Sequence, residues 1–366
     1  MRALNIGLLF LASYGLFAGL AAEQQKFVIH EWGTFTTVSG SDGKVLVFYP
    51  DNQDLPGFVV RNNYQLKKDT MSTVSLETPV LYAYAPKAMT FSAKARFSKG
   101  DFTEWYPAAS FNWKTSHIIE WPKVEVLPGE KADLPDGSGG KRYYHARKTD
   151  AALLRVTQKD GMQHEKFIFY RGTGACAFPA LLTASAGGRF VFHNSAEAPV
   201  AALFLVEVQD KKVRFLEQGA LTVGQEARLQ MPAEHSGADK LADALVRVLT
   251  KEGLYEKEAR AMVATWRDHW MEEDGTRVLY IVPRAVTEDF LPLEVTPKPD
   301  ELTRVMVGRM EIFTPEREAE LRALVAEAEK GSPDDQREAS KALAKLGRLA
   351  TPARERVQQL NQAEKK

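Results

Sequence analysis

The chain has 366 residues, too many for one small core and enough for two or three units of about 100–200 residues each. Lysine and arginine together number 48, as do aspartate and glutamate, so the formal net charge is zero. A nucleic-acid or anionic-membrane partner normally requires a basic excess, so neither is expected. The single cysteine excludes an internal disulfide framework, and stability must come from packing.

The N-terminus has the pattern of an export signal. Arg2 is a short basic start, an apolar run continues from Leu4 to about Leu20, and small residues follow. This pattern predicts a signal peptide over residues 1–22, with cleavage near Ala22, and therefore a periplasmic or secreted protein. A retained membrane anchor is the alternative. Nothing later in the sequence is long and apolar enough to span a bilayer, so no stable span is expected after cleavage.

Residues 23–233 consist of short β-like runs separated by glycine, proline, asparagine and aspartate. The segment MTFSAKARF (89–97) alternates apolar and polar residues, as a strand with one buried face does. The segment VAALFLVEV (200–208) is apolar on both faces and belongs inside a sheet. We therefore expect a mainly β fold, with a β-sandwich-like or irregular antiparallel β unit over 23–233.

Helical periodicity begins after about residue 233. Apolar residues recur at helical spacing between 238 and 270, and two strand-like runs follow at 276–283 and 303–313. This spacing predicts an α+β section over 234–313 that packs on the β unit.

The C-terminal tail, residues 314–366, contains clear helix-start signals. TPERE, SPDDQ and TPARE each place Thr or Ser as N-cap and Pro as first helical residue, which predicts helices near 315–330, 333–346 and 352–362. Part of the tail weakly resembles one HEAT-type helical pair. We expect a helical lid or a docking element for a protein partner, and we expect the β unit to stay folded without it.

The string HEWGTFTTV begins at His30 and raises the question of a site. If it is a strand, His30 and Trp32 share one face while Glu31 points to the other. His30 is a candidate metal ligand, but the pleat prevents it from easily sharing an ion with Glu31. A second histidine four residues later, as in helical zinc proteases, is missing. The simpler interpretation is a satisfied imidazole and a glutamate held by arginine or backbone amides.

Glutamate precedes tryptophan again at Glu104–Trp105. A carboxylate near an indole can have a raised pKa, and exposed indoles such as Trp32 and Trp105 can stack on flat ligands such as sugar rings. A glycosidase-like pair would bring Glu104 within about 5–9 Å of a second carboxylate. The simpler interpretation is strands with one aromatic inward and one acid outward. The candidate catalytic carboxylates are Glu31, Glu77, Glu104 and Glu273.

Polar residues are densest in WRDHWMEEDGTR (266–277). On a helix His269 and Glu273 are four residues apart, which suits either two metal ligands or an ordinary surface pair. Acidic residues at a helix C-terminus need compensation by a positive group, and Arg277 is the nearest candidate; a bound cation is the alternative. Arg171, in the glycine-rich YRGTG, is a candidate binding residue for an anion, although the P-loop ending GK[ST] is missing.

Five strings together carry a resemblance: IHEWGTFTTV, LETPVLYAY, FTEWYP, YRGTG and WRDHWMEEDGTRVLYIVPR. The combination resembles an uncharacterised family of predicted secreted bacterial proteins and would cover residues 27–313. The resemblance implies export and a β-rich build, and it implies no activity, substrate or site.

The leading hypothesis is an exported, non-catalytic binding or scaffold protein of the cell envelope, without a cofactor. No nucleophile–base pair or metal motif has the spacing that chemistry requires. The alternative is a hydrolase of envelope or extracellular polymer that uses the candidate carboxylates, with a divalent metal as a possible cofactor. The alternative requires those carboxylates and a histidine to converge on one substrate.

Overall fold

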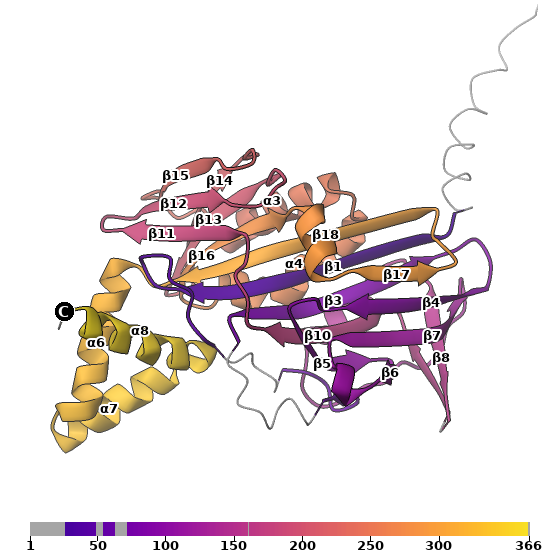
Figure 1. The fold of residues 1–366 in the computed structure, drawn as a ribbon, viewed down its shortest axis with the longest axis horizontal. Coiled ribbons are helices and arrows are strands. Elements are labelled where there is room, and N and C mark those ends of the chain that lie inside the picture. The colour runs from indigo at the N-terminus through magenta and orange to yellow at the C-terminus, as the bar shows by residue number, and fades with distance from the viewer. Residues whose placement is uncertain (1–25, 49–53, 63–71, 160, 365–366) are drawn as a thin grey trace, which may run out of the picture.

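The computed structural model describes residues 26–48, 54–62, 72–159 and 161–364 (Figure 1). The expected signal peptide over 1–22 lies outside these residues. Among the described helices, none combines the length and apolar character needed to cross a bilayer.

A long central sheet organises the described part of the chain. Strand β1 lies in its middle, antiparallel to β3 and parallel to β18, which comes almost 300 residues later. The two strands β16 and β18 of the expected α+β section therefore lie in the same sheet as the β-rich region. The order of the nine described strands is β14 (Lys212–Gln218), β13 (Leu203–Gln209), β16 (Gly275–Val282), β18 (Glu301–Ile312), β1 (Val28–Ser39), β3 (Val74–Tyr84), β10 (Ile168–Gly174), β5 (Gly100–Tyr106) and β2 (Val60–Arg61).

Two smaller sheets and helix α5 (Arg284–Phe290) cover one face of the central sheet. The ring of Tyr170 in the central sheet packs there against Trp121 of one smaller sheet, and Tyr280 packs against Phe192 of the other, which is the sandwich-like packing expected from the sequence. The first smaller sheet contains β17 (Leu293–Thr296), β4 (Met89–Arg96), β7 (Ile118–Leu127), β8 (Leu153–Gln158) and β9 (Gly161–Glu165), with β6 (Ser110–Phe111) beside β7, and the second contains β11 (Ala180–Ser185), β12 (Arg189–Asn194) and β15 (Glu226–Gln230).

Helices α3 (Ala238–Lys251) and α4 (Glu256–Met271) cover the other face. Both helices bury the apolar side chains that the sequence placed at helical spacing, including Leu245 and Trp266. The short 3-10 helix η2 (Tyr143–Arg147) packs beside α4; a second, η1 (Trp113–Thr115), precedes β7.

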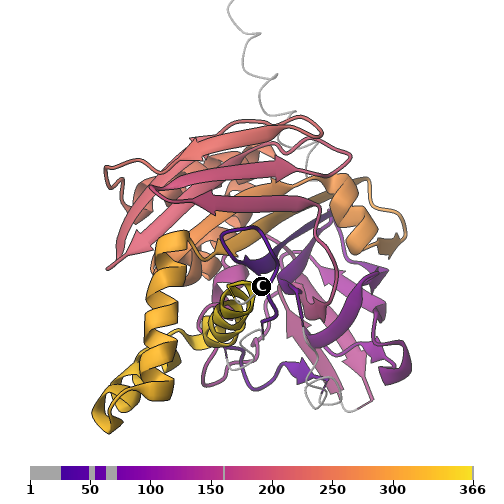
Figure 2. The same cartoon turned by 60° about the vertical axis from the view of Figure 1, so that its left-hand side comes forward.

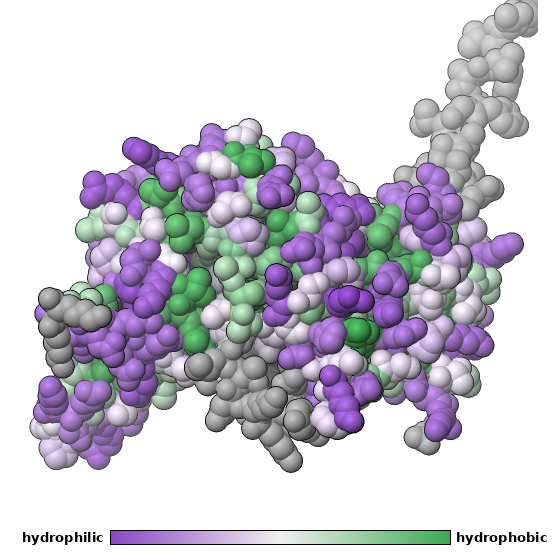
Figure 3. Space-filling model, viewed as in Figure 1, coloured by the Kyte–Doolittle hydropathy of each residue, from purple (hydrophilic) through white to green (hydrophobic). Residues whose placement is uncertain are grey.

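The tail consists of α6 (Pro315–Lys330), α7 (Pro333–Ala344), the 3-10 helix η3 (Gly347–Leu349) and α8 (Ala350–Ala363). The Thr314 and Ser332 side chains cap α6 and α7 as expected. The third expected cap is wrong, because α8 begins at Ala350, before Thr351, and has no side-chain cap. α7 lies farthest from the sheets (Figure 2), and the visible face of the tail is mainly hydrophilic (Figure 3). The inward faces of the helices form a separate core with body residues that include Val38, Leu46 and Phe48.

The mainly β fold with an α+β section is confirmed, and so are several local patterns. In β4 the apolar side chains of Phe91, Ala93 and Ala95 are buried while their neighbours are more exposed. Strand β13 is buried on both faces between β14 and β16. Among residues 44–48, only Val45 and Phe48 pair, each in an isolated β-bridge.

A chain that ends at Phe313 should melt cooperatively but at a lower temperature than the full chain. Removal of the tail exposes Val38, Leu46 and Phe48, each worth about 1.5–3 kcal/mol when buried. We expect the melting temperature to fall on the order of 10 °C, measured by circular dichroism. Loss of the cooperative transition would show that the tail is an integral part of the β unit.

Candidate functional site

The pairing register of the central sheet is irregular at the same level in neighbouring strands. β1 and β3 shift between Trp32 and Thr34, β10 and β3 shift between Phe169 and Gly172, and β10 and β5 shift beside Arg171. Bulges redirect side chains and are common next to functional sites. The five strings noted in the sequence meet in this region, which makes it the first candidate site.

Gly33 shows how close the strands come there, and Thr78 shows that the backbone is strained. A Cβ on Gly33 would lie 3.0 Å from Met306 Sδ and 3.0 Å from Pro79 Cα, so the strands can approach only where a side chain is absent. Thr78 has φ 52°, which is unfavourable for a β-branched residue. The surrounding structure therefore holds the backbone in a conformation that threonine would not choose alone.

A continuous group of charged side chains lies on the α4 side of these bulges; we name it the charged cluster. Most of its members are buried, and hydrogen bonds, ion pairs or electrostatic interactions link each to another. Five carboxylates face five guanidinium groups, and the more exposed Asp268 also pairs with Arg142, at 3.1 Å. The charged cluster comprises Asp54, Glu77, Glu104, Glu273 and Glu311, with Arg142, Arg171, Arg277, Arg309 and Arg348, and the imidazole of His269.

Two candidate carboxylates, Glu77 and Glu273, are joined by one residue of the tail. Arg348 of η3 donates to Glu77 Oε1 at 3.3 Å and to Glu273 Oε2 at 3.2 Å. Thr36 donates to the other oxygen of Glu77 at 2.9 Å, and Arg309 donates to Glu273 Oε2 at 2.9 Å. Both acids are therefore held in position by several donors.

His269 and Glu273 form the pair that their spacing predicted, with Nδ1 and Oε2 2.9 Å apart. Burial lowers the pKa of His269 to about 3; the Glu273 carboxylate opposes this shift, whereas Arg348 and Arg309 reinforce it. Burial alone would raise the pKa of Glu273, but the His269 hydrogen bond and the two arginine charges hold it well below its usual range. We therefore assign a neutral imidazole beside an ionised carboxylate at neutral pH.

Glu104 and Arg171 lie at the opposite end of the charged cluster. Burial raises the pKa of Glu104, although the Arg171 charge and the Thr103 hydroxyl act against the shift. Arg171 makes a two-pronged contact with Asp54, at 2.7 and 2.8 Å. Burial opposes ionisation of Asp54 as well, yet Arg171 keeps its pKa at about 2. Thr78 and Arg142 line a cavity of about 10 Å³ here, which is room for about one water molecule.

Arg277 compensates the acidic end of α4 as the sequence suggested. Its guanidinium donates to the backbone carbonyls of Trp270 at 3.0 Å and Glu273 at 2.7 Å, and its Nε lies 2.9 Å from Glu311 Oε1. Arg277 is fully buried. It therefore acts as a helix C-terminal cap and offers no exposed surface to a ligand.

His30 and Glu31 point to opposite faces of β1, as the pleat predicts. His30 Nδ1 lies 2.7 Å from Glu258 Oε2 of α4, on the helix face. Glu31 lies on the face of the smaller sheets, where Arg304 Nε donates to it at 2.6 Å and the Tyr170 hydroxyl also donates. The glutamate is thus held by an arginine, and neither residue belongs to the charged cluster.

The two candidate stacking tryptophans do not present their rings to solvent. Trp32 is fully buried in the core against α4, and Trp105 is buried in the core against the smaller sheets. The expectation that these two rings stack on a ligand is therefore corrected, because apolar side chains of the two cores surround them. Among the described residues, no group of three His, Cys, Asp or Glu side chains is arranged to hold a metal ion. His269 and Glu273 form only a pair.

A cleft of about 1040 Å³ opens at the other end of α4, beside His30. One wall is the edge-to-face pair of Tyr84 and Tyr255, with ring centroids 5.0 Å apart. The Tyr84 hydroxyl donates to Glu258 Oε1 at 2.7 Å, and the backbone N–H of Tyr255 donates to Glu258 Oε2 at 2.8 Å. Further lining comes from the charged residues Lys26, Glu130, Lys131, Asp150, Lys166, Glu256 and Lys257.

Sequence reasoning missed Glu258, Arg309 and Arg348. A signal existed for Arg309, because it and Glu311 are charged residues two apart in the otherwise apolar second half of β18, and so share one buried face. Glu258 is an ordinary acid in the first turn of α4 by sequence. Arg348 is one of many tail charges, and only the tertiary fold distinguishes it.

Comparisons with known proteins add little to this description. No protein family and no curated protein matches the sequence. One similar structure is the Fcho1 mu homology domain of Danio rerio with bound Eps15 peptide, with a TM-score of 0.32 and 7% identity, covering 80% of this chain and 99% of that chain. Another is the yeast delta-COP-I mu-homology domain complexed with Dsl1 WxWxV peptide, with a TM-score of 0.33 and 8% identity, covering 78% and 98%. Likeness at this level supports no inference about function.

Lowering the pH from 7 to 5 should destabilise the protein through His269. Its ordinary pKa is 6.5 and its folded value is about 3, so between these values the unfolded chain binds a proton that the folded chain does not. The stability from neutral His269 is complete above about pH 6.5 and is lost as the pH falls, by up to about 2 kcal/mol at pH 5.

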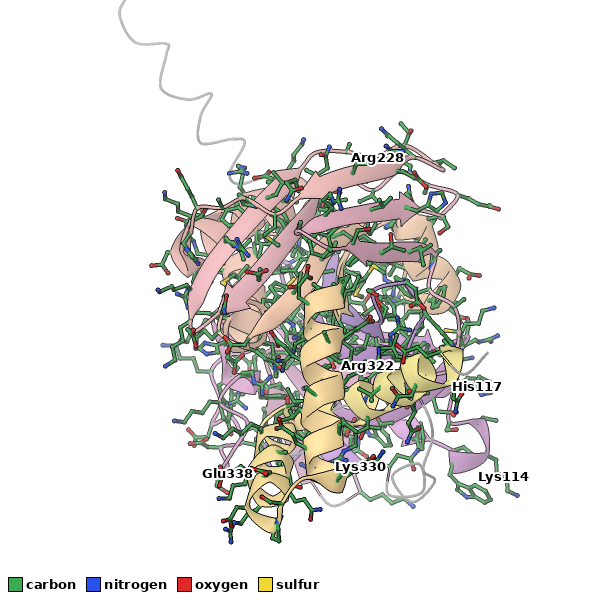
Figure 4. The ribbon with its side chains drawn as sticks, turned by 90° about the vertical axis from the view of Figure 1, so that its left-hand side faces the viewer. Lys114, His117, Arg228, Arg322, Lys330 and Glu338 are labelled. Atoms are coloured by element: carbon green, nitrogen blue, oxygen red, sulfur yellow. The ribbon has the colours of Figure 1, made fainter. Side chains whose placement is uncertain are left out.

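Denaturant unfolding at both pH values checks this prediction. His269→Gln should reduce the pH dependence, whereas the exposed control His117→Gln (Figure 4) should keep it. Equal pH dependence in the wild type and His269→Gln would contradict the assignment of a neutral, buried imidazole.

Arg304→Met should cost about 3–5 kcal/mol of unfolding free energy, because it leaves the Glu31 carboxylate buried without its countercharge. The double change Glu31→Leu and Arg304→Met should recover most of that loss. The control Arg284→Met removes an exposed pair with Glu288 and should cost at most about 1 kcal/mol. Urea unfolding of the four proteins measures the difference; equal effects of the two arginine changes would contradict it.

Proposed function

We propose that the protein is exported to the periplasm or cell exterior, as its N-terminal pattern and its resemblance to secreted bacterial proteins suggest. We propose further that it binds a polar segment of an envelope polymer, without cleaving it. The observation that carries the binding proposal is the large cleft at the start of α4.

The chemistry of the cleft suits a polar, extended ligand. Its charged lining offers ammonium donors such as Lys131 and carboxylate acceptors such as Glu130 side by side. Tyr255 has 37% of its surface exposed, so its ring can stack on a sugar while hydroxyl groups bond to the charged neighbours. A purely apolar ligand would leave these polar groups without partners.

The aromatic wall is held rigidly from behind. Glu258 is fully buried and accepts hydrogen bonds from Tyr84 and from the Tyr255 backbone, while His30 lies against both rings. A wall that is already ordered loses little conformational entropy when a ligand binds. This arrangement gives His30 and Glu258 a positioning role in the proposed binding site.

The charged cluster favours binding over hydrolysis. Glu77 and Glu273 are each engaged by arginine, and the cavity that Asp54 and Arg171 line has room for about one water molecule. Glycosidase-like carboxylates must flank a sugar bond, which requires far more space. The hydrolase is the alternative function, and an assay for released polymer fragments decides between the two.

The tail remains a candidate docking element for a protein partner.

Co-sedimentation of the purified mature chain with insoluble peptidoglycan tests the proposal. Tyr255→Ala should weaken binding about five- to tenfold, because it removes the exposed ring of the cleft. Trp113→Ala removes a more exposed aromatic ring outside the cleft and should leave binding unchanged. Equal binding by the two variants would show that the cleft is not the site. Release of soluble fragments by the wild type would favour the hydrolase.

A further inference from the structure

The contact between the tail and the charged cluster has the form of a ligand in a binding site. Arg348 extends its guanidinium between two acids that come from β3 and from the segment after α4, and its side chain is only 6% exposed. We propose that Glu77 and Glu273 form a binding site for a guanidinium group, and that Arg348 is its exchangeable internal occupant.

The two carboxylates are positioned without help from Arg348. Thr36 holds the second oxygen of Glu77 at 2.9 Å, and His269 and Arg309 each contact Glu273 at 2.9 Å. All three donors belong to the body of the protein. The site therefore keeps its shape when the Arg348 side chain leaves, which is the preorganisation that a binding site needs.

Arg348 fits this site less well than other buried arginines fit theirs. Its contacts of 3.3 and 3.2 Å are longer than the 2.6 Å between Arg304 and Glu31 and the 2.7 and 2.8 Å between Arg171 and Asp54. Charge-assisted hydrogen bonds are usually about 2.7–2.9 Å long. An occupant with such long contacts can be replaced at modest cost.

The charge balance and the shape of the site select the class of ligand. Without Arg348, Glu77 and Glu273 lose a positive charge that both of them contact. A planar guanidinium can donate to both carboxylates at once, whereas a compact ammonium ion cannot span them as well. The side chain of Glu273 remains 25% exposed even beside Arg348, which gives a ligand a route in.

The tail need not detach for this exchange. Its apolar core with Val38 and Phe48 does not include Arg348, and Arg356 makes a separate ion pair with Glu318 at 2.6 Å. Only the Arg348 side chain has to rotate away. The ligand is either a small guanidinium compound or an arginine side chain of a partner protein.

Chemical rescue of Arg348→Ala in the full chain tests the proposal. The variant should melt at a lower temperature than the wild type. Ethylguanidinium at about ten times its Kd should raise the melting temperature by about 3 °C and saturate, whereas ethylammonium at equal ionic strength should not. The wild type should respond less, since its own arginine competes. The double variant Arg348→Ala, Glu273→Gln should not be rescued by ethylguanidinium.

The control Arg322→Ala removes an exposed tail arginine paired with Glu364 (Figure 4) and should show no rescue. Binding of a short capped Ala-Arg-Ala peptide to Arg348→Ala distinguishes the two sources of the guanidinium group. Tighter binding than ethylguanidinium indicates an arginine side chain of a partner protein, and weaker binding indicates a small compound. No saturable response of Arg348→Ala, or the same response in Arg322→Ala, would overturn the proposal. If Arg348→Ala does not fold alone, its refolding yields with ethylguanidinium and with ethylammonium are compared instead, and only ethylguanidinium should raise the yield.

Discussion

Charge compensation inside the central sheet is the constraint on which the rest of the structure depends. Arg277 and Arg309 have no exposed surface, yet arginine keeps its charge inside proteins. Removing such a charge from water costs several kcal/mol, and only a close partner with good hydrogen bonds offsets that cost. Glu311 contacts both arginines, and Glu273 contacts Arg309. The end of α4 and the strands β16 and β18 are consequently fixed relative to one another by pairs that cannot be separated singly.

Local patterns in the sequence predicted much of the secondary structure, for physical reasons that act over a few residues. Alternation along 89–97 is a property of one strand, and the caps at Thr314 and Ser332 are properties of one helix turn. The pleat alone placed His30 and Glu31 on opposite faces of β1. These inferences needed no knowledge of which elements pack together.

The order of strands and the composition of the charged cluster were beyond such reasoning. Strand β1 pairs with β3 and with β18, and the residues that contact Glu31 come from segments 139 and 273 positions later. Arg348 resembles the other tail arginines by sequence, but the fold alone brings it to Glu77. Pairing between distant segments depends on complementary surfaces, which one strand's pattern does not reveal.

The parallel pairing of the first and last strands of the central sheet has a consequence for biosynthesis. β1 is made well before its partner β18, since Val28 pairs with Glu301, so this part of the sheet cannot close until the whole segment between them exists. Contacts between such remote segments form slowly, because a long loop must first be ordered. A growing chain therefore keeps this edge of β1 unpaired until the whole of β18 has been made.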